Sequence, residues 1–509
     1  ARRRQAARPS ASSRRRRPAR HVPGEPVVRR LPVLALVVAI LVAGGLASSW
    51  IRQSSPPTPT RPATTSLAVM AAPTTATASS WYCTGASGPG NPVARGTLYM
   101  VNSSEKPVKG TLTAYDSTGH RVKESITVPA LGQATATPGT IASGAWLASR
   151  IDLDGGGVAV HQLVAGPTGW SMAPCSTQAG TSWYFASGAT TLGNQLYVSL
   201  FNPTKGTAVV DLTFVTGRGG VQPAPFQGLI IQPNAVVTAE VASYVQDQSA
   251  VATVVHARSG RVVASELQVH TASGQSGVSL RLGALQPSPQ WYVPSSQDAT
   301  GGTSQLAVFN PTRRPEHVTV ATRLASGPVA PLHQTMAPHS TWTLDLGSQT
   351  RIPVGTQYAL TVDATGGGVV VDRVAAAPAG APAPQWGAVT AVAGHATASP
   401  TGRWTLPNPA LNSVHVEAGA QPSAVVLFNP GDRTVRATVT SLGTGGLPLT
   451  GAGTLEVAPH ALVVVPAKGI ADGGLAALRV TADRPLAATE DVAPAGLAGI
   501  VAGSAVPQA

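Results

Sequence analysis

Hydrophobic and polar positions follow two different patterns along the chain and divide it into a short N-terminal part and a long C-terminal part. Residues 31–51 (LPVLALVVAILVAGGLASSWI) form an unbroken run of 21 residues without charge. At 1.5 Å per residue, a helix of this length spans about 30 Å, the thickness of the hydrocarbon core of a bilayer. After residue 80, apolar residues instead recur at every second position in short segments, which is the pattern of half-buried β-strands.

The apolar run predicts a single transmembrane signal-anchor at residues 31–51. The preceding residues 1–30 hold 11 Arg and one acidic residue, Glu25. By the positive-inside rule this Arg-rich tail stays in the cytoplasm, where it also contacts anionic lipid, and the C-terminal part lies outside the membrane. A cleaved signal peptide is the alternative, with Gly45-Leu46-Ala47 as its small-residue cleavage site.

The remaining charge does not indicate a nucleic-acid partner. The net charge of the chain is +13, but residues 31–509 contribute only +3 of it, from 24 basic and 21 acidic side chains. Basicity is therefore a property of the N-terminal tail. Residues 52–80 are dominated by Pro, Thr, Ser and Ala, a composition that cannot bury enough apolar area to fold, and we expect an extended linker there.

The chain repeats itself from residue 81 onward. Each repeat opens with a Trp, which is followed by Tyr in the first three copies, at Trp81-Tyr82, Trp183-Tyr184, Trp291-Tyr292 and Trp404. About twenty residues later, an apolar segment ends in an Asn, at Asn102, Asn202, Asn310 and Asn429. A strongly alternating segment follows, and each repeat closes on a Val- or Ala-rich segment. Turn residues such as Pro, Gly, Thr and Asp separate the segments.

About 100 residues per repeat, short alternating strands and no helical periodicity predict an all-β fold. We expect four tandem β-sandwiches of immunoglobulin or fibronectin type, which form a rod or a bent array. The predicted boundaries are 81–180, 181–288, 289–378 and 404–509, with a second linker at 379–403. The closing strands carry His161, Glu266, Asp372 and Glu490. Because these four side chains differ in charge type, we expect them on an exposed face rather than in a shared site.

The two cysteines, Cys83 and Cys175, bracket the first repeat. A location outside the membrane is oxidising, so we predict a disulfide between them. They are 92 residues apart, so they do not form a CxxC redox motif.

Motifs that carry chemistry are missing from the sequence. It has no GxSxG, HExxH, P-loop or strand-associated GxGxxG motif, and its His residues show no metal-ligand spacing. We therefore predict no catalytic, cofactor-binding or metal-binding residues, and a protein that is not an enzyme. An enzyme whose residues converge only in three dimensions is the alternative. The Trp-Tyr pairs could stack on sugar rings, but their recurrence at each repeat boundary favours packing in a core or between domains.

The combination of an Arg-rich tail, one signal-anchor, a Pro/Thr linker and repeats of the Trp-Tyr … Phe-Asn-Pro kind resembles a family of uncharacterised actinobacterial envelope proteins. The residues that carry this resemblance are Trp183-Tyr184 with Phe201-Asn202-Pro203, Trp291-Tyr292 with Phe309-Asn310-Pro311, and Phe428-Asn429-Pro430. The first repeat departs from the pattern with Val101-Asn102-Ser103. The resemblance implies a location and a fold, and it supplies no catalytic residues.

These observations predict a non-catalytic, membrane-anchored scaffold or binding protein of the cell envelope that engages an extracytoplasmic protein partner. The alternative is an envelope polysaccharide-binding protein that uses exposed aromatic residues. Burial of Trp183 and Trp291 would count against that alternative. A one-span signalling protein that recruits a partner to the Arg-rich tail is a further candidate.

Overall fold

The structure is a computed structural model that describes residues 69–271, 277–297, 303–376, 389–393, 403–407, 424–443, 453–466, 477–492 and 501–508. The described part is almost entirely β, with one short helix, α2 (Pro138–Ile141), and one 3-10 turn, η2 (Ala224–Phe226). This confirms the predicted all-β class. No helix in the described ranges is long and apolar enough to cross a membrane. The predicted span at residues 31–51 lies outside them.

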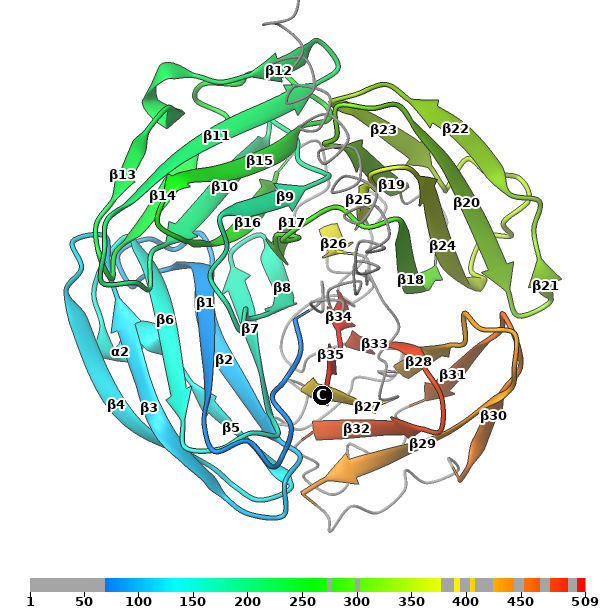
Figure 1. The fold of residues 1–509 in the computed structure, drawn as a ribbon, viewed down its shortest axis with the longest axis horizontal. Coiled ribbons are helices and arrows are strands. Elements are labelled where there is room, and N and C mark those ends of the chain that lie inside the picture. Colours follow the sequence, from blue (N-terminus) through cyan, green and yellow to red (C-terminus); the bar gives the residue numbers. More distant parts are fainter. Residues whose placement is uncertain are drawn as a thin grey trace, which may run out of the picture. The chain divides into compact units, whose positions relative to one another are not determined.

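Residues Ser66–Ala509 form one compact unit, in which the strands fall into four modules with the same topology. Each module has a four-stranded sheet and a companion sheet (Figure 1). In module 2 the four-stranded sheet has the order β14-β10-β16-β17, and the companion sheet has the order β12-β11-β15-β9 with β13 also on β11. In module 1 the two sheets are joined by one parallel residue pair between β1 and β2, Ser87 with Arg95.

The strands of the first two modules cover residues 79–174 and 182–282. Module 1 contains β1 (Ser79–Ser87), β2 (Arg95–Asn102), β3 (Val108–Tyr115), β4 (Arg121–Val128), β5 (Gly132–Ala136), β6 (Trp146–Leu153), β7 (Val158–Gly166) and β8 (Gly169–Pro174). Module 2 contains β9 (Ser182–Phe185), β10 (Asn194–Phe201), β11 (Ala208–Thr216), β12 (Gly219–Val221), β13 (Leu229–Ile231), β14 (Val236–Glu240), β15 (Ala252–Ser259), β16 (Val263–His270) and β17 (Gly277–Leu282).

The strands of the other two modules cover residues 290–393 and 403–507. Module 3 contains β18 (Gln290–Gln297), β19 (Thr303–Asn310), β20 (Glu316–Leu324), β21 (Gly327–Pro328), β22 (Leu332–Met336), β23 (Ser340–Asp345), β24 (Gln357–Thr365), β25 (Val370–Ala376) and β26 (Val389–Ala393). Module 4 contains β27 (Arg403–Pro407), β28 (Ala424–Phe428), β29 (Val435–Leu442), β30 (Leu455–Val457), β31 (Leu462–Pro466), β32 (Ala477–Ala482), β33 (Ala487–Val492), β34 (Val501–Ser504) and β35 (Val506–Pro507).

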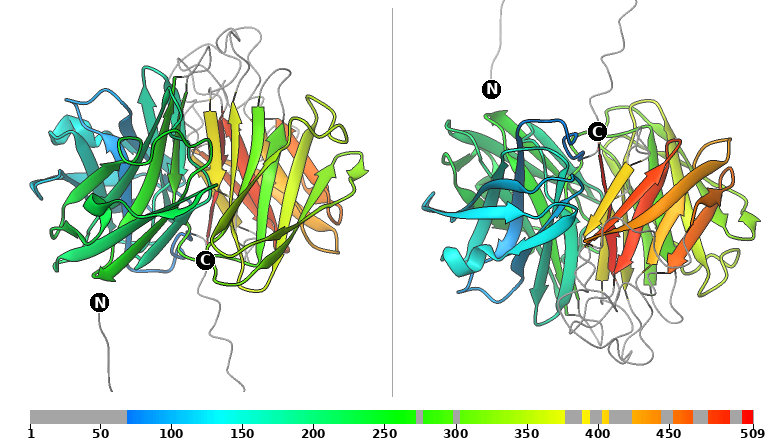
Figure 2. Two further views of the ribbon diagram at one scale, coloured as in Figure 1. Left: turned by 90° about the horizontal axis from the view of Figure 1, so that it is seen from above. Right: turned by 90° about the horizontal axis from the view of Figure 1, so that it is seen from below.

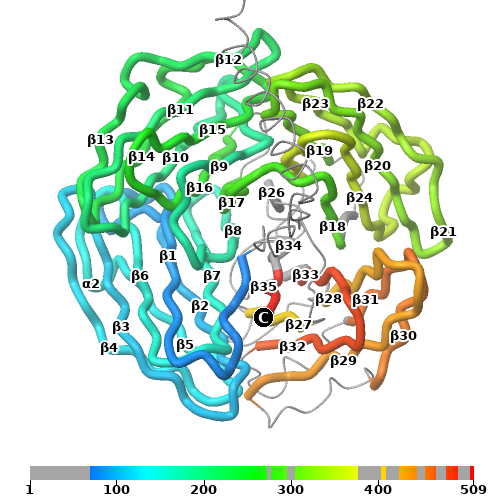
Figure 3. The backbone as a smooth tube through the Cα atoms, in the orientation of Figure 1, coloured from blue at the N-terminus to red at the C-terminus, as the bar shows by residue number. Residues whose placement is uncertain are grey.

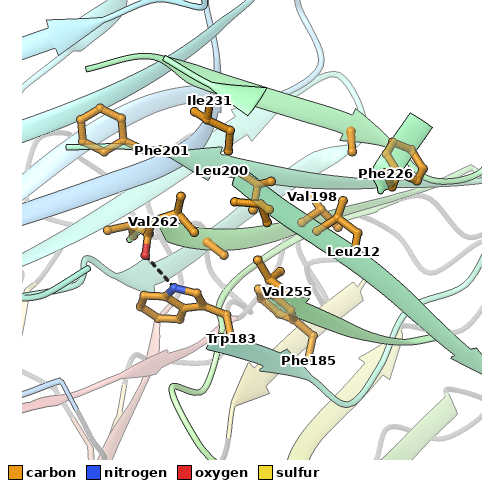
Figure 4. Close-up of a cluster of buried hydrophobic side chains, with 14 of the residues drawn as sticks. Trp183, Phe185, Val198, Leu200, Phe201, Leu212, Phe226, Ile231, Val255 and Val262 are labelled. Carbon is orange, nitrogen blue, oxygen red and sulfur yellow. Dashed lines mark hydrogen bonds between the residues drawn. The ribbon is translucent and has the colours of Figure 1, made fainter. Parts of the chain in front are cut away.

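The Trp of each repeat anchors the core between the two sheets of its own module. Trp183 is 1% exposed and packs among residues from both sheets of module 2 (Figure 4). Its indole N–H donates a hydrogen bond of 2.7 Å to the carbonyl of Val262, so the polar atom of the ring is satisfied inside the core. Trp291 and Trp404 make the equivalent bonds to the carbonyls of Val369 and Leu486. The recurring Trp is thus a core residue in each module.

The Asn of each repeat fixes a turn at the end of the second strand of its module. All four Asn residues are fully buried. The Asn202 side-chain amide donates to the carbonyls of Gly206 and Ile231, at 2.8 and 3.0 Å, and its oxygen accepts from the Thr204 amide. The other three copies make the same kinds of bond, at Asn102, Asn310 and Asn429. The Asn side chain therefore supplies, in place of a backbone donor, the hydrogen bond that joins two chain segments 29 residues apart.

Junctions between consecutive modules form a closed circuit. The last strands β8, β17, β26 and β34 lie beside one another in the order β8, β17, β26, β34 and back to β8 (Figure 1). The Tyr of one Trp-Tyr pair packs near the Phe of the next Phe-Asn-Pro motif. Tyr82 lies 6.5 Å from Phe201 between ring centroids, and Tyr292 lies 6.2 Å from Phe428. Figure 2 shows the four modules from above and from below.

The fourth junction joins module 4 to module 1, and it uses different residues. Here Thr405 stands where the other repeats have Tyr, and Val101 and Ser103 stand where they have Phe and Pro. The side-chain amide of Gln508 donates to both Ser103 Oγ and Thr405 Oγ1. The two departures from the repeat pattern therefore meet at one junction, where a polar contact from the C-terminal strand replaces the aromatic pair.

The two ends of the described chain meet at this same junction. Ala71 is fully buried and forms a parallel bridge with Gln508, and β35 pairs with β27 beside it (Figure 3). The Ala71 amide donates to the carbonyl of Pro507 at 2.9 Å. Residues from the two ends thus close the circuit by main-chain pairing.

The observed arrangement differs from the predicted one in two respects. The contacts close on themselves, whereas a rod or bent array of modules was predicted. Strand β26 lies inside the predicted linker 379–403, and Ala71 lies inside the predicted linker 52–80. Both segments are rich in Ala and Thr with few charges. They are paired here because an edge strand needs only backbone hydrogen bonds and one apolar face.

Replacing Asn202 with Ala tests the role of the repeated Asn. The change leaves the buried carbonyl of Ile231 without its side-chain donor and removes a second bond to the carbonyl of the exposed Gly206, so we expect a loss of about 1–3 kcal/mol in the free energy of unfolding. Denaturant unfolding followed by tryptophan fluorescence measures it. Asn91→Ala is the matched control, because Asn91 accepts a single bond of 3.3 Å from the Val93 amide. Equal losses in the two variants would contradict the assigned role.

Candidate functional site

The predicted disulfide is present. Cys83 in β1 and Cys175, directly after β8, are bonded, with their Cα atoms 4.7 Å apart. The bond joins the first strand of module 1 to its last strand, and both residues are 2% exposed. In the chain-entropy model, closing a loop of this size stabilises the fold by about 4–5 kcal/mol.

The four polar residues of the closing strands are buried, and the prediction of an exposed face was wrong. His161, Glu266, Asp372 and Glu490 are at most 3% exposed. The reason is that each four-stranded sheet is covered on one face by its companion sheet and on the other by the neighbouring module. Strand register places Glu266 opposite Val198 and Asp372 opposite Ala307. Val198 belongs to the core of module 2, so Glu266 points into its own module.

At the junction of modules 2 and 3, two of these carboxylates share one guanidinium. Arg281, on β17 directly opposite Glu266, forms an ion pair with it inside module 2. The Arg281 Nε also lies 4.0 Å from an Asp372 carboxylate oxygen that comes from module 3. All three side chains are at most 4% exposed. We call these three residues the buried charge triad.

Donors from the end of β9 complete the triad. The Asp372 carboxylate accepts from the backbone amides of Ala186 and Ser187, at 2.9 and 3.0 Å, and from the Ser187 hydroxyl. Arg281 in turn donates to the hydroxyl and the carbonyl of Ser187, each at 2.7 Å. Asp372 is therefore held by main-chain donors of another module, and the triad fastens module 3 to module 2. Its carboxylates are occupied by these structural donors.

Burial raises the pKa of the Glu266 carboxyl to about 7; the Arg281 guanidinium partly offsets this, and the Asp372 carboxylate adds to it. Burial likewise raises the pKa of Asp372, although Arg281 and the two backbone amides lower it in part. Two carboxylates with one guanidinium would leave a net negative charge out of water. Protonation of the Glu266 carboxyl removes that charge.

A cavity of about 230 Å³ lies beside the triad. Its walls come from the end of β9 and the following loop, from β16 and β17, and from β19, β23 and β25 of module 3. The side chains that give it its polar character are Ser187, Thr191, Asn194, Gln268, His270, Ser279, Arg281, Gln305 and Thr343. In the described part of the chain no group of three or more His, Cys, Asp or Glu is arranged to hold a metal ion.

The sequence prediction missed Arg281, Ser187 and the polar lining of the cavity. One signal was present: β17 carries a single charge, Arg281, in an otherwise uncharged strand, and β16 carries a single acid, Glu266. Lone opposite charges on neighbouring apolar strands indicate a buried pair, since an unpaired charge is not buried. Ser187 gave no comparable signal, because its role depends on its position between two modules.

The fold and the site define a multi-module all-β protein with a polar cavity at one module junction. Residues 156–398, a little under half of the chain, match the model of a family of unknown function, DUF5719. The match identifies an uncharacterised domain family, as the resemblance implied. It runs from the start of β7 to the end of module 3, so it includes the triad and the cavity.

Comparison with curated proteins gives no match. Among solved structures, the crystal structure of Thermotoga maritima 1070 has a TM-score of 0.19 and 15% identity, and covers 21% of this chain and 93% of its own. A tetra-tandem repeat in the extending region of a large adhesion protein has a TM-score of 0.11 and 13% identity, with 86% and 99% covered. An α-L-rhamnosidase of Streptomyces avermitilis, complexed with L-rhamnose, has a TM-score of 0.11 and 9% identity, with 76% and 55% covered. Such scores carry no argument about this chain.

The raised pKa of Glu266 predicts a pH-dependent stability. The folded protein keeps this proton up to about pH 7, whereas the unfolded chain releases it near the ordinary value of 4.5. The contribution is therefore complete below about pH 4.5 and is lost as the pH rises through about 7. We expect the free energy of unfolding to fall by on the order of 1–3 kcal/mol across this window.

The Glu266→Gln variant provides the comparison for this measurement, because it keeps the side-chain shape without the titrating proton. Denaturant unfolding of both proteins at a series of pH values gives the slope of the free energy of unfolding against pH for each. Titrating groups that both proteins share contribute equally to the two slopes, so their difference reports on Glu266. A variant as pH-dependent as the parent would contradict the assignment of the proton to the triad.

Proposed function

We propose that this chain is a non-catalytic, membrane-anchored scaffold or binding protein on the outer side of the cell membrane, and that it engages a protein partner. The carrying observation is the closed circuit of module junctions. The repeated Trp, Tyr, Phe and Asn residues support packing within and between modules, and the two chain ends are paired at the last junction. Packing within and between modules thereby explains the repeat motifs, and this role is consistent with a rigid scaffold.

Two further parts of this proposal come from the sequence and concern the membrane and the compartment. Residues 31–51 would form the single transmembrane helix, with the Arg-rich tail on anionic lipid in the cytoplasm. The Cys83–Cys175 disulfide supports an oxidising location for residues 69–508. We also propose that the modules are β-sandwiches of the broad immunoglobulin or fibronectin kind. In modules 2 to 4 the first two strands enter different sheets, whereas immunoglobulin domains place them side by side.

The alternative is a glycan-binding protein that stacks sugars on its repeated aromatic residues. The residues proposed for that stacking are buried. Trp81, Trp183, Trp291 and Trp404 are at most 3% exposed, and Tyr292 is 7% exposed. A stacking platform needs an open ring face. The burial of these rings counts against sugar stacking, so the protein-partner proposal stands first.

Module 2 offers the surface on which a protein partner would dock. Of the large hydrophobic side chains exposed in the described part, Val221, Ile230 and Tyr244 all belong to this module, at 41%, 58% and 51% exposure. Ile230 lies on β13, and among the described strands β13 pairs only with β11. Its other edge presents backbone groups to which an extended peptide can add as a further strand.

A photo-crosslinking amino acid at position 230, in the full chain expressed in its own cells, tests this proposal. We expect irradiation of intact cells to give a discrete protein adduct, because β13 presents an open edge with an apolar side chain. The same amino acid at Thr118, an exposed turn residue of module 1, is the control and should give none. No adduct from positions 230, 221 or 244 would contradict a protein partner at module 2.

A further inference from the structure

The cavity at the junction of modules 2 and 3 has a wall from each module. Gln268 and Glu266 on β16 pair with Ser279 and Arg281 on β17, so these four side chains point to one face. Gln305 and Thr343, from β19 and β23 of module 3, lie on the other side. Because each module supplies one wall, neither module alone would form the site.

The lining offers neutral hydrogen-bonding groups without a free charge. The hydroxyl of Ser279 is fully buried, lines the cavity, and has no hydrogen-bond partner among the described residues. Such a group costs free energy unless something inside the cavity binds it. Arg281, the cation in the wall, is neutralised by two carboxylates. An anion therefore meets no net positive charge there, and a cation meets no free carboxylate.

The volume limits the size of the ligand. Sites for drug-sized molecules measure about 300–1,000 Å³, so a cavity of about 230 Å³ takes something smaller. A single ring with several hydroxyl groups fits this volume and satisfies hydroxyl and amide partners on both walls.

We propose that this cavity binds one neutral, hydroxyl-rich ring, that is, a single sugar residue. The site differs from the aromatic platform considered above, and it does not rest on the proposed protein partner. The unpartnered hydroxyl of Ser279 in module 2 bonds the sugar residue, and Gln305 of module 3 faces it across the junction. Gln268 and Asn194 also line the cavity, where they are held in place by bonds to each other, to the Ala189 amide and to the Thr191 hydroxyl. The same chemistry is offered by a free monosaccharide and by the terminal residue of an envelope polysaccharide.

Saturation-transfer NMR on the full chain in detergent micelles tests this inference. The probes are methyl glycosides of glucose, galactose, mannose and N-acetylglucosamine, with glucuronic acid and glucosamine as charged counterparts. We expect transfer to at least one neutral glycoside and none to the charged sugars. No transfer to any neutral sugar, or transfer to the charged ones alone, would overturn the proposal. A tetrasaccharide that ends in the bound sugar then separates the sources: binding assigns a polysaccharide end, and exclusion assigns the free sugar.

Two variants locate the binding. Ser279→Ala removes one neutral hydrogen bond and should weaken the affinity by about 2- to 10-fold. Ala307→Leu, on β19 of module 3, fills the cavity and should abolish transfer. Ser265→Ala is the matched control: Ser265 on β16 is buried like Ser279, its hydroxyl likewise has no hydrogen-bond partner among the described residues, and it is absent from the cavity lining. It should leave the affinity unchanged. Unchanged binding in Ser279→Ala, or in a folded Ala307→Leu protein, would place the sugar elsewhere.

Discussion

The constraint on which the rest of the structure depends is that the central strands of each four-stranded sheet are buried on both faces. Strands β10 and β16 are buried along nearly their whole length. The companion sheet of the same module covers one face, and only a neighbouring module can cover the other. Because every module needs a neighbour on that second face, a linear array would leave one sheet uncovered. Closing the circuit between module 4 and module 1 removes this uncovered face.

Much of the local structure was predictable from the sequence, and the arrangement of the modules was not. The alternating segments predicted to be strands are strands in the described residues, because alternation and turn residues are local signals. The disulfide was predicted from the expected location outside the membrane and from the presence of two cysteines. The exposed face predicted for Glu266 and Asp372 was wrong, however, because that prediction compared only charge types and took no account of a neighbouring module on the second face of the sheet. The pairing of Thr405 with Val101 and Ser103 at one junction could not be predicted, since these departures lie about 300 residues apart in sequence.

The candidate site likewise combines local features that were predictable with an arrangement of modules that was not. Four polar residues were correctly placed on the closing strands from the sequence, namely His161, Glu266, Asp372 and Glu490. The environment predicted for them was wrong, because they are buried. The triad assembles because Asp372 points out of module 3 and Arg281 points into module 2, beside the donors at Ala186 and Ser187. A buried ion pair contributes specificity as much as stability, and here it fixes how two modules meet. The polar cavity is a consequence of that junction.

Closure of the circuit by the chain ends is the central claim, and an engineered disulfide measures it directly. Ala71 and Gln508 form an isolated parallel bridge, which brings their Cα atoms within the range that a disulfide needs. In the full chain carrying Ala71→Cys and Gln508→Cys, with the native disulfide retained, air oxidation should form a second intramolecular disulfide. Mass spectrometry of the monomer and a gel shift on reduction would detect it. Two free thiols in the folded monomer, or a bond formed only between copies, would contradict the closed circuit.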